Sequence, residues 1–521
     1  MIPVFEVFPI ARGIRSGRNP VTAQDIEKLR SLGITHILDL RQAREWTIPW
    51  PGAEAIQAIT EAAGIERLNL PVEDGSAPAL EVLDRAHAFL SDAQQRPGAQ
   101  VFVHCRAGRE RTGAVLTAHL ARRNGWSYER ALAALQAVNP LIRPLRAQEA
   151  VVRRWLANER PGRAPDYASR VRGCLLGGAV GDALGAGVEF LSLDEIRAAH
   201  GPRGVTGYVP AYGRLGAVTD DTQMTLFTAE GLIRAWVRGR SRGIGHPPGV
   251  VRRAYLRWLQ TQGEAAAEDA PLDGWLAREP ALHSRRAPGN TCLAALRAGG
   301  SGTRAQPLND SKGCGGVMRA APAGLIPSLS PEEVFELGAD CAALTHGHPS
   351  GYLSAGALAA VLRVLLDGET LARAVSGAAA LLPVHPGHEE TSAALAGAVE
   401  LAAAGAPSPE KVESLGEGKV GEEALAIAVY CALAAPDPRS ALLLAVNHSG
   451  DSDSTGAICG NLLGALHGEQ ALPAEWLEPL ELRATIERLA DDFVTEMTDP
   501  SMAPGGWGEP PQEWWDLYPG W

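Results

Sequence analysis

The sequence VFVHCRAGRERTGAV, residues 101–115, decides the fold of the first part of the chain. Its apolar start predicts a short buried strand, and a loop of polar and small residues separates that strand from a helical pattern over residues 112–123. A loop at a helix N-terminus gathers backbone N–H groups and the positive end of the helix dipole, which makes an anion site. Cys105 lies in that loop, so we expect a stabilised thiolate with a pKa below the ordinary value of about 8.5. Arg111 offers a planar pair of donors for phosphate oxygens, and Thr112 can donate its hydroxyl to the sulfur.

Predicted strands and helices alternate on both sides of this segment, over residues 1–157. The strands are predicted at residues 34–40 and 65–70, and the helices at residues 25–32, 80–93 and 128–138. This alternation is typical of an α/β domain with a central, mainly parallel sheet flanked by helices.

The rest of the chain has a different pattern. Residues 158–168 are polar with two prolines, which predicts a linker. Beyond it the strand signals fade, and Ala- and Leu-rich helical stretches alternate with Gly, Pro and Ser loops over residues 169–521. The sequence therefore predicts an α/β domain over residues 1–157 and an all-α domain over residues 169–521.

The composition is that of a globular chain with an uneven charge. Of its 521 residues, 45% are hydrophobic and 21% charged, and the net charge is −12. Residues 1–160 hold about 21 Lys and Arg against about 17 Asp and Glu, roughly +4, which leaves about −16 for the remainder. The first part therefore suits an anionic substrate, and the second suits cations such as metal ions.

The sequence also favours a cytoplasmic location. No uninterrupted apolar run reaches the roughly 18 residues of a membrane helix, so we expect no membrane partner. Residues 1–6 show no basic region leading into an apolar stretch, as a secretory signal would. The seven cysteines are scattered without a C-x-x-C pair, which favours free thiols in a reducing compartment.

The loop from Cys105 to Thr112 has the pattern C-x5-R-[ST] and resembles the signature of the protein tyrosine and dual-specificity phosphatase superfamily. The resemblance implies that Cys105 forms a thiophosphate intermediate that Arg111 stabilises, without a cofactor. Asp74 stands where the family's general acid lies and would act first as acid and then as base, with Glu73 as its rival. The residues expected to bind the substrate within the loop are Arg106, Ala107, Gly108, Arg109 and Glu110.

Two features refine this interpretation. Arg106 and Arg109 favour a substrate with several negative charges, such as a phosphoinositide or a nucleotide, although solvation of the surface explains them nearly as well. Arg143 and Gln148 resemble the family's later segment, which positions substrate and water.

Glycine recurs every fourth residue in RVRGCLLGGAVGDALGAGVEF, residues 170–190. Each glycine inside a helix costs about 1 kcal/mol relative to Ala, so the stripe predicts a second backbone packed very close to this helix. Asp182 and Glu189 are two helical turns apart and share a face if the helix continues. The stripe consists of Gly173, Gly177, Gly181 and Gly185.

Two acidic stretches each precede a predicted helix, TDDT at residues 219–222 and GDSDSTG at residues 450–456. Thr, Asp and Ser are good N-caps, so capping alone explains either stretch. The second stretch also mimics a calcium loop, but its twelfth position is Leu462 instead of Glu, which excludes that interpretation. Together the two stretches supply hard oxygen ligands suited to Mg²⁺ or Mn²⁺, with two ions bridged by an Asp as one arrangement.

Five ordered segments spanning most of residues 170–468 look like the ADP-ribosylglycohydrolase family, which includes the dinitrogenase-reductase-activating glycohydrolase. They are GDALGAGVEF, TDDTQMTL, SKGCGGVMRAAP, LTHGHPSG and HSGDSDSTGAICGNLLGALHG. The resemblance implies an all-α fold with a binuclear Mg²⁺ or Mn²⁺ site. Its metal ligands fall on Thr219, Asp220, Asp221, Asp451 and Asp453, with Ser454 at a position often held by Thr.

The same resemblance implies roles for residues around the metals. Glu189 matches the family's acid near the ribose, which closes the site or contacts the metal-bound water. For His346 and His348, a structural, hydrogen-bonded role is the alternative to a place in the site. A glycine loop is expected against the diphosphate or adenosine of the substrate, and it contains Gly313, Gly315, Gly316 and Met318.

These features predict a bifunctional hydrolase. The C-terminal domain would remove ADP-ribose from a protein, a nucleic acid or a small molecule, and the N-terminal domain would hydrolyse a phosphorylated substrate. The two reactions could follow one another on one substrate, if cleavage of a phosphate-linked ADP-ribose exposes the phosphate. The alternative hypothesis is that only the ADP-ribosyl hydrolase is catalytic, while the phosphatase-like domain recognises phosphate or regulates its neighbour.

Overall fold

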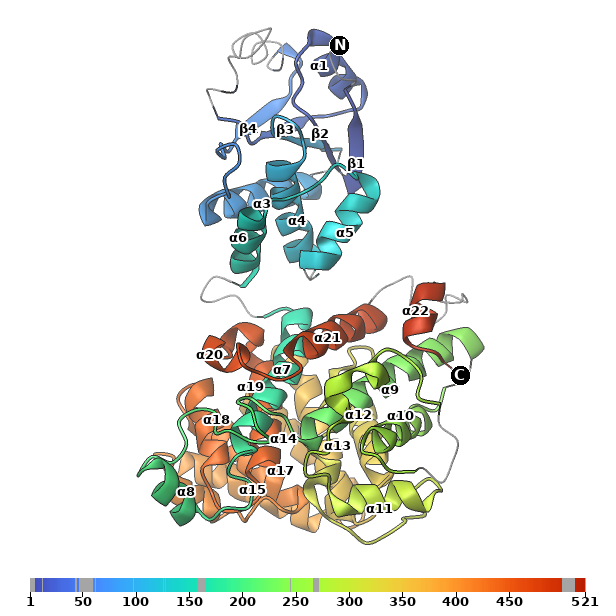
Figure 1. Cartoon of the computed structure of the whole chain (residues 1–521), viewed down its shortest axis with the longest axis vertical. Helices are drawn as coiled ribbons and strands as arrows, with labels where there is room; N and C mark the ends of the chain where they lie inside the picture. Colours follow the sequence, from blue (N-terminus) through green and yellow to red (C-terminus); the bar gives the residue numbers. More distant parts are fainter. Residues whose placement is uncertain are drawn as a thin grey trace. The chain divides into compact units, whose positions relative to one another are not determined.

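The computed structural model of the chain divides into two compact units, Met1–Arg163 and Ala164–Trp521 (Figure 1). It describes residues 5–11, 13–42, 45, 60, 62–96, 98–124, 126, 128–157, 165–243, 245–265, 271–498 and 511–520. The division falls within residues 158–168, the predicted linker, of which residues 158–164 lie outside the described ranges. The first helix of the second unit begins at Tyr167.

The N-terminal unit contains a five-stranded sheet in the order β1-β2-β5-β3-β4. Its strands are β1 (Val7–Ala11), β2 (Ile14–Gly17), β3 (His36–Asp39), β4 (Glu66–Asn69) and β5 (Val101–His104). Strand β1 pairs antiparallel with β2 and every other pairing of these strands is parallel, which confirms the predicted mainly parallel sheet. Strand β5 is central, with β2 and β3 as parallel neighbours, so Cys105 follows it at the carboxyl edge of the sheet.

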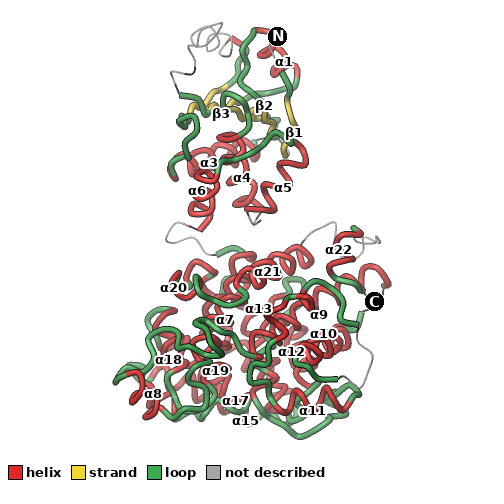
Figure 2. The backbone as a smooth tube through the Cα atoms, viewed as in Figure 1, coloured by secondary structure: helices red, strands yellow, loops and turns green. Residues whose placement is uncertain are grey.

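Helices cover both faces of this sheet (Figure 2). They are α1 (Ala23–Ser31), α3 (Leu80–Gln95), α4 (Glu110–Asn124), α5 (Tyr128–Val138) and α6 (Arg146–Ala157). Alternation along β5 explains the two layers, because successive side chains of a strand point to opposite faces. Val101 and Val103 belong to the core that α3, α4, α5 and α6 share, whereas Phe102 packs with Ile26 and Leu29 of α1. The predicted strand therefore runs through the middle of the unit, buried on both faces.

The C-terminal unit is all-helical in its described residues apart from isolated bridges, which confirms the predicted fold class. Its α-helices are α7 (Tyr167–Gly185), α8 (Leu193–His200), α9 (Asp220–Arg242), α10 (Pro247–Thr261), α11 (Asn290–Ala298), α12 (Pro331–Ala343), α13 (Pro349–Leu366), α14 (Leu371–Leu381), α15 (Glu389–Ala403), α16 (Pro409–Glu413), α17 (Gly421–Ala434), α18 (Pro438–Val446), α19 (Ser452–His467), α20 (Ala474–Leu477), α21 (Arg483–Thr498) and α22 (Gln512–Leu517).

The glycine stripe of α7 packs against a second glycine stripe on α19. A Cβ built at Gly181 would lie 1.9 Å from the carbonyl oxygen of Gly456, and one at Gly460 would lie 1.9 Å from that of Gly177. The predicted close backbone contact is therefore confirmed. The contacts run in opposite order along the two helices, so the C-terminal end of α7 lies beside the N-terminal end of α19. The paired positions are 173 with 464, 177 with 460, 181 with 456 and 185 with 452.

Helix α7 ends at Gly185, so Asp182 and Glu189 do not share a helical face. The condition under which both acids would share a face, a helix that continues to Glu189, is therefore not met. Gly185 and Gly187 weaken further helix growth, and the chain turns over residues 186–190, which carry Glu189.

Helix α13 is long and apolar enough to cross a membrane by length and composition alone. However, 78% of that stretch is buried inside the C-terminal unit, as in the core helix of a folded domain. Its one charged side chain, Arg363, donates to the carbonyl oxygens of Pro327 and Leu329, at 3.1 and 2.7 Å.

Replacing Gly181 by Ala tests the backbone contact. We expect Gly181→Ala to lower the free energy of unfolding by about 2–3 kcal/mol, because the new carbon would overlap a carbonyl oxygen that the helix cannot move. Gly397 of α15 is the matched control, since a Cβ there meets no atom within 4 Å. Gly397→Ala should raise the free energy of unfolding by about 0.5–1 kcal/mol through helix propensity. Urea unfolding measures both, and equal effects at the two positions would contradict the packing described.

Candidate active sites

The loop after β5 makes a tight turn that begins at Cys105, which is 2% exposed. Gly108 has φ +70°, and a Cβ there would lie 2.2 Å from the carbonyl oxygen of Gly17 at the end of β2. A residue with a side chain does not fit at this position, so the loop is pressed against the neighbouring strand. Helix α4 begins at Glu110, and the loop therefore stands at the N-terminal end of a buried helix, where the dipole attracts anions.

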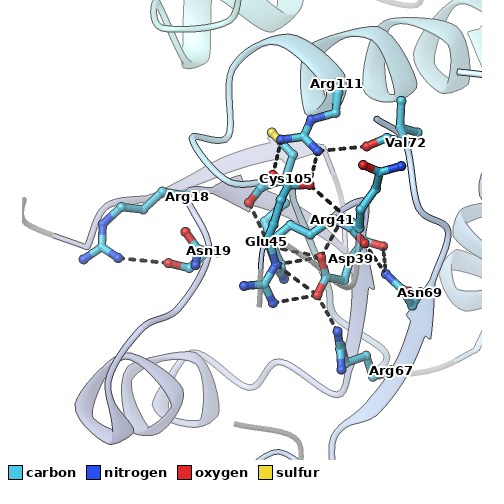
Figure 3. Close-up of polar contacts among 12 residues, drawn as sticks. Arg18, Asn19, Asp39, Arg41, Glu45, Arg67, Asn69, Val72, Cys105 and Arg111 are labelled. Atoms are coloured by element: carbon cyan, nitrogen blue, oxygen red, sulfur yellow. Dashed lines mark hydrogen bonds and ion pairs between the residues drawn. The ribbon is translucent and has the colours of Figure 1, made fainter. Parts of the chain in front are cut away.

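Arg111 is almost fully buried, and its guanidinium forms a bidentate ion pair with the Glu45 carboxylate (Figure 3). Nη1 and Nη2 donate to the two carboxylate oxygens of Glu45, each at 2.7 Å, and Nη1 also donates to the Val72 carbonyl at 2.9 Å. Burial alone would raise the pKa of Glu45, but the hydrogen bonds and charge of Arg111 lower it. Sequence reasoning missed Glu45, because no motif marks an isolated acid so far from the loop.

The structure separates the two candidate acids. Asp74 Oδ1 forms an ion pair with Arg111 Nη2 at 2.8 Å, and the Asp74 side chain is 53% exposed. Glu73 instead accepts a hydrogen bond from the Ser76 hydroxyl at 3.4 Å. Of the two candidate acids, Asp74 is thus the one that contacts Arg111.

A buried network fixes the strand ends beneath the loop (Figure 3). Asp39 accepts from the guanidinium groups of Arg41 and Arg67, at 2.7 and 2.6 Å. His104 Nδ1 lies 3.0 Å from the carbonyl oxygen of Cys105, which can only accept, so this nitrogen carries a proton. Burial lowers the pKa of His104 to about 4, against the attraction of Asp39, so its imidazole is neutral at pH 7. The neutral His104 side chain, at the end of β5, therefore donates a hydrogen bond to the Cys105 carbonyl, the first carbonyl of the loop.

Exposed arginines surround the mouth of this loop. The backbone N–H of Arg143 donates to the Arg109 carbonyl at 3.4 Å, which brings the segment before α6 alongside the loop. The side chains of Arg106, Arg109, Arg143 and Arg146 are all exposed, and none forms an ion pair within the described ranges. Exposed guanidinium groups of the loop and of the segment before α6 are therefore free of ion pairs within the described ranges.

Two buried polar side chains complete the first site. The Thr112 hydroxyl is buried and meets no hydrogen-bond partner in the part of the chain that the structure describes, so it is available to the sulfur or to a ligand. Gln148 donates from Nε2 to the Ser76 carbonyl at 2.9 Å and accepts from the Leu145 N–H at 3.0 Å. Gln148 thereby ties the turn that carries Asp74 to the start of α6.

The second site forms where three helix ends meet. Asp182, close to the end of α7, accepts hydrogen bonds from the Thr219 N–H at 3.0 Å and from the Thr222 N–H at 3.1 Å. The Thr222 hydroxyl donates to the same carboxylate at 2.5 Å. Asp182 thus holds the N-terminal end of α9 against α7, whose glycines hold the N-terminal end of α19. The predicted metal ligands of the two acidic stretches come together at this junction.

The acids at this junction are buried among one another. Asp220, Asp221 and Asp453 are 4%, 3% and 2% exposed. Burial raises the pKa of each of these carboxyl groups, and the negative charges of their acidic neighbours raise it further. Burial and the charges of Asp451 and Asp182 raise the pKa of Glu189 to about 7. Mutual repulsion of the ionised carboxylates therefore lowers the stability of the fold at neutral pH unless a positive charge lies beside them.

These residues suit a divalent cation by their chemistry. Asp221 Oδ1 is buried and has no hydrogen-bond partner among the described residues, which leaves one carboxylate oxygen open for an ion. As the side chains stand, no three His, Cys, Asp or Glu within the described ranges are grouped closely enough to hold a metal. A cation would therefore have to draw the carboxylates inward.

The predicted glycine loop reaches the acidic cluster through Cys314. The Cys314 thiol donates to Asp451 Oδ2 at 3.2 Å, and Cys314 Sγ lies 3.6 Å from the Ser454 hydroxyl oxygen. Ser454 also lies 3.9 Å from the Met318 sulfur. The sequence analysis named the glycines of this loop but not Cys314 as a residue of the site. The position of Cys314 between Gly313 and Gly315 was the signal that could have indicated it.

The two histidines of the LTHGHPSG segment make structural contacts. His346 is buried under this loop, and a Cβ at Gly315 would lie 2.9 Å from its Cε1. Its Nδ1 lies 2.8 Å from the Thr345 hydroxyl, and burial lowers the pKa of His346 to about 3. His348 accepts from the Ser350 N–H and caps α13.

Comparison with known proteins assigns each unit a family. Residues 163–501 match the ADP-ribosylglycohydrolase family, and residues 19–155 match the dual specificity phosphatase catalytic domain. The chain is 27% identical to the ADP-ribosylarginine hydrolase Tri1 of Serratia proteamaculans, over 65% of this chain and 83% of that protein. It is also 27% identical to the ADP-ribosyl-[dinitrogen reductase] glycohydrolase of Rhodospirillum rubrum, over 62% of this chain and 94% of that protein. Mouse protein phosphatase Slingshot homolog 3 is 31% identical over 23% of this chain and 17% of its own length.

Metal binding at the acidic cluster can be measured by thermal unfolding. We expect MnCl₂ or MgCl₂ at a hundredfold excess over its dissociation constant to raise the melting temperature by about 5 °C, since binding then contributes about 2.7 kcal/mol. Asp221→Asn should abolish this rise and should be no less stable than the unaltered protein in EDTA, because it removes a repelled charge. The exposed Asp194 of α8 offers a control, and Asp194→Asn should keep the full rise. A rise that survives Asp221→Asn would place the ion elsewhere.

Proposed function

We propose that both units of the chain are catalytic. The chain belongs to the ADP-ribosylglycohydrolase family over residues 163–501, and it carries a dual specificity phosphatase catalytic domain over residues 19–155. The C-terminal unit removes ADP-ribose from a modified acceptor, and the N-terminal unit hydrolyses a phosphate monoester. The observation that carries the first activity is the meeting of α7, α9 and α19 in one cluster of buried, mutually repelling carboxylates.

In the C-terminal unit, the residues proposed to hold Mg²⁺ or Mn²⁺ are Thr219, Asp220, Asp221, Asp451, Asp453 and Ser454. When bound, such ions supply a template for the ribose hydroxyls and lower the pKa of water. Glu189 has a pKa of about 7, so its carboxylate can take a proton from the attacking water at neutral pH. The loop of Gly313, Gly315 and Gly316 is proposed to bind the diphosphate or adenosine of the substrate, while His346 and Gly351 fill the space that a Cβ would take at Gly315 and Gly316.

In the N-terminal unit, the Cys105 sulfur attacks phosphorus, and the bond from phosphorus to the leaving oxygen breaks. Asp74 gives its proton to that oxygen, and Arg111 donates to the phosphoryl oxygens. A water molecule then attacks the thiophosphate and gives a proton to Asp74, and the bond from sulfur to phosphorus breaks, which releases phosphate and restores the Cys105 thiolate. The open arginines at the mouth, Arg106 and Arg109 among them, favour a substrate with a second anionic group.

The two activities fit one substrate in sequence. Hydrolysis of ADP-ribose from a phosphate end exposes a phosphate monoester, which is the substrate class of the N-terminal unit. ADP-ribosylated proteins are the other acceptor class, since the relatives in Serratia and Rhodospirillum are named for ADP-ribosylarginine and for dinitrogen reductase. All seven cysteines are free, which supports the proposal of a cytoplasmic protein.

Crossed variants test whether both units are catalytic. Cys105→Ser should lower phosphate release from an aryl phosphate at least about 10³-fold and leave ADP-ribose release unchanged. Asp451→Asn with Asp453→Asn should do the reverse. Phosphate release and ADP-ribose release are measured on each protein with MgCl₂ present. Loss of both activities in either variant, or absence of one activity from the unaltered protein, would contradict the bifunctional proposal.

The choice between the two acids predicts a leaving-group effect. Asp74→Asn should slow hydrolysis of alkyl phosphates by about 10²-fold or more, because a poor leaving oxygen needs the proton. It should slow aryl phosphates with acidic phenols much less. Glu73→Gln is the matched control and should leave both rates near those of the unaltered protein. If Glu73→Gln shows the leaving-group dependence instead, Asp74 is not the general acid.

A further inference from the structure

Beside the acidic cluster, two arginines share one carboxylate. Glu481 is 4% exposed and accepts from Arg214 Nη1 at 3.0 Å and from Arg286 Nη2 at 3.1 Å. Its other oxygen accepts from the Val218 N–H at 3.1 Å. We call the two arginines the Arg214–Arg286 pair. Together with the single negative charge of Glu481, their two positive charges give a net charge of about +1.

Arg286 adjoins the predicted metal ligands directly. Its carbonyl oxygen accepts from the Asp220 N–H at 3.1 Å, at the start of α9. Arg286 is 8% exposed, and its Nη1 is buried with no hydrogen-bond partner among the described residues. An unmet N–H of a charged group is costly in a protein interior, so this atom has an unused capacity to bind an oxygen.

Tyr212 covers the guanidinium. The Arg286 carbon Cζ lies 4.7 Å from the centre of the Tyr212 ring. Tyr212 has φ +51°, a backbone conformation that a bulky residue seldom adopts, and it is 45% exposed. Burial and the charges of Glu189 and Asp453 raise the pKa of its phenol, so the ring that Arg286 faces also lies within reach of those acidic charges. Tyr212 is therefore an exposed side chain that stacks on the buried guanidinium of Arg286.

The Arg214–Arg286 pair and the glycine loop meet the cluster at different residues. The glycine loop contacts Asp451 and Ser454 through Cys314, whereas Arg286 contacts Asp220. The ADP portion of the substrate is assigned to the glycine loop, which leaves the acceptor for the side of Tyr212. A cationic acceptor such as an arginine side chain would be repelled there, and an anionic acceptor would be attracted.

We propose that Arg286, on which Tyr212 stacks, binds the phosphate of a phosphate-linked acceptor and makes the C-terminal unit selective for ADP-ribose attached to phosphate over ADP-ribose attached to arginine. This inference rests on the proposed ADP-ribosyl hydrolase activity. In the reaction, a water oxygen bonds to the anomeric carbon and a water proton passes to Glu189. The bond from that carbon to the phosphate oxygen breaks, and the phosphate departs with the electron pair, held by Arg286.

The test compares two substrates on the full chain carrying Cys105→Ser, so that no phosphate is removed by the N-terminal unit. One substrate is an oligonucleotide whose terminal phosphate carries ADP-ribose, and the other is ADP-ribosylated agmatine, an arginine analogue. We expect a higher kcat/KM for the phosphate-linked substrate. Arg286→Gln should lower the ratio of the two kcat/KM values at least about tenfold, and Arg286→Lys should restore part of it.

Two further variants guard against misfolding and nonspecific charge effects. Arg214 is 44% exposed in its side chain, so Arg214→Gln should fold normally and lower the ratio about threefold by removing the excess charge. Arg285, which pairs with Glu264 on the surface, is the control, and Arg285→Gln should leave the ratio unchanged. An equal loss on both substrates in Arg286→Gln would place the residue at the diphosphate that they share and overturn the acceptor assignment.

The substrate preference of the protein with an unaltered C-terminal unit separates the role of Arg286 from the proposed ADP-ribosyl hydrolase activity. If the protein cleaves the arginine-linked substrate and spares the phosphate-linked one, the ADP-ribosyl hydrolase stands and the phosphate-binding role of Arg286 is wrong. If it releases ADP-ribose from neither substrate, the proposed hydrolase itself fails, and this inference fails with it.

Discussion

Direct contact between the backbones of α7 and α19 is the constraint on which the C-terminal unit depends. Glycines at every fourth position of both helices let each carbonyl of one helix occupy the space of a missing side chain on the other. The antiparallel pairing then fixes the end of α7 beside the start of α19. Asp182 extends the arrangement by accepting the first N–H groups of α9, so that three helix ends deliver their acids to one place.

The two units treat buried carboxylates in opposite ways. In the N-terminal unit each buried acid near the loop faces a guanidinium: Asp39 faces Arg41 and Arg67, and Glu45 faces Arg111. Those pairs fix the residues beneath the Cys105 loop, while Arg106 and Arg109 of that loop stay exposed. In the C-terminal unit the acids face one another, and their pKa values rise accordingly. The two sites thus differ in the charge that lines them, with guanidinium groups at the first and carboxylates at the second.

Short motifs allowed the sequence to predict much of this. The strand, loop and helix of residues 101–115 are encoded within a single stretch, and the spacing of the glycines announces the close helix pair before any partner is known. The contacts that were missed join residues far apart along the chain. Glu45 and Arg111 are separated by 66 positions, Cys314 and Asp451 by 137, and Arg286 and Glu481 by 195. Such long-range contacts depend on tertiary packing, and no periodic pattern in the sequence predicts them. Whether α7 would continue to Glu189 stayed open in the sequence, and in the structure the helix ends at Gly185.

The glycine contact is proposed to bring the residues of a divalent metal site together where the ends of α7, α9 and α19 meet. Anomalous diffraction at the manganese edge, from crystals of the full chain soaked with MnCl₂ and ADP-ribose, tests it most directly. We expect anomalous peaks between the Asp220–Asp221 carboxylates and the Asp451–Asp453 carboxylates, with Glu189 beside them. Manganese bound elsewhere, with no peak between these two acidic stretches, would contradict it.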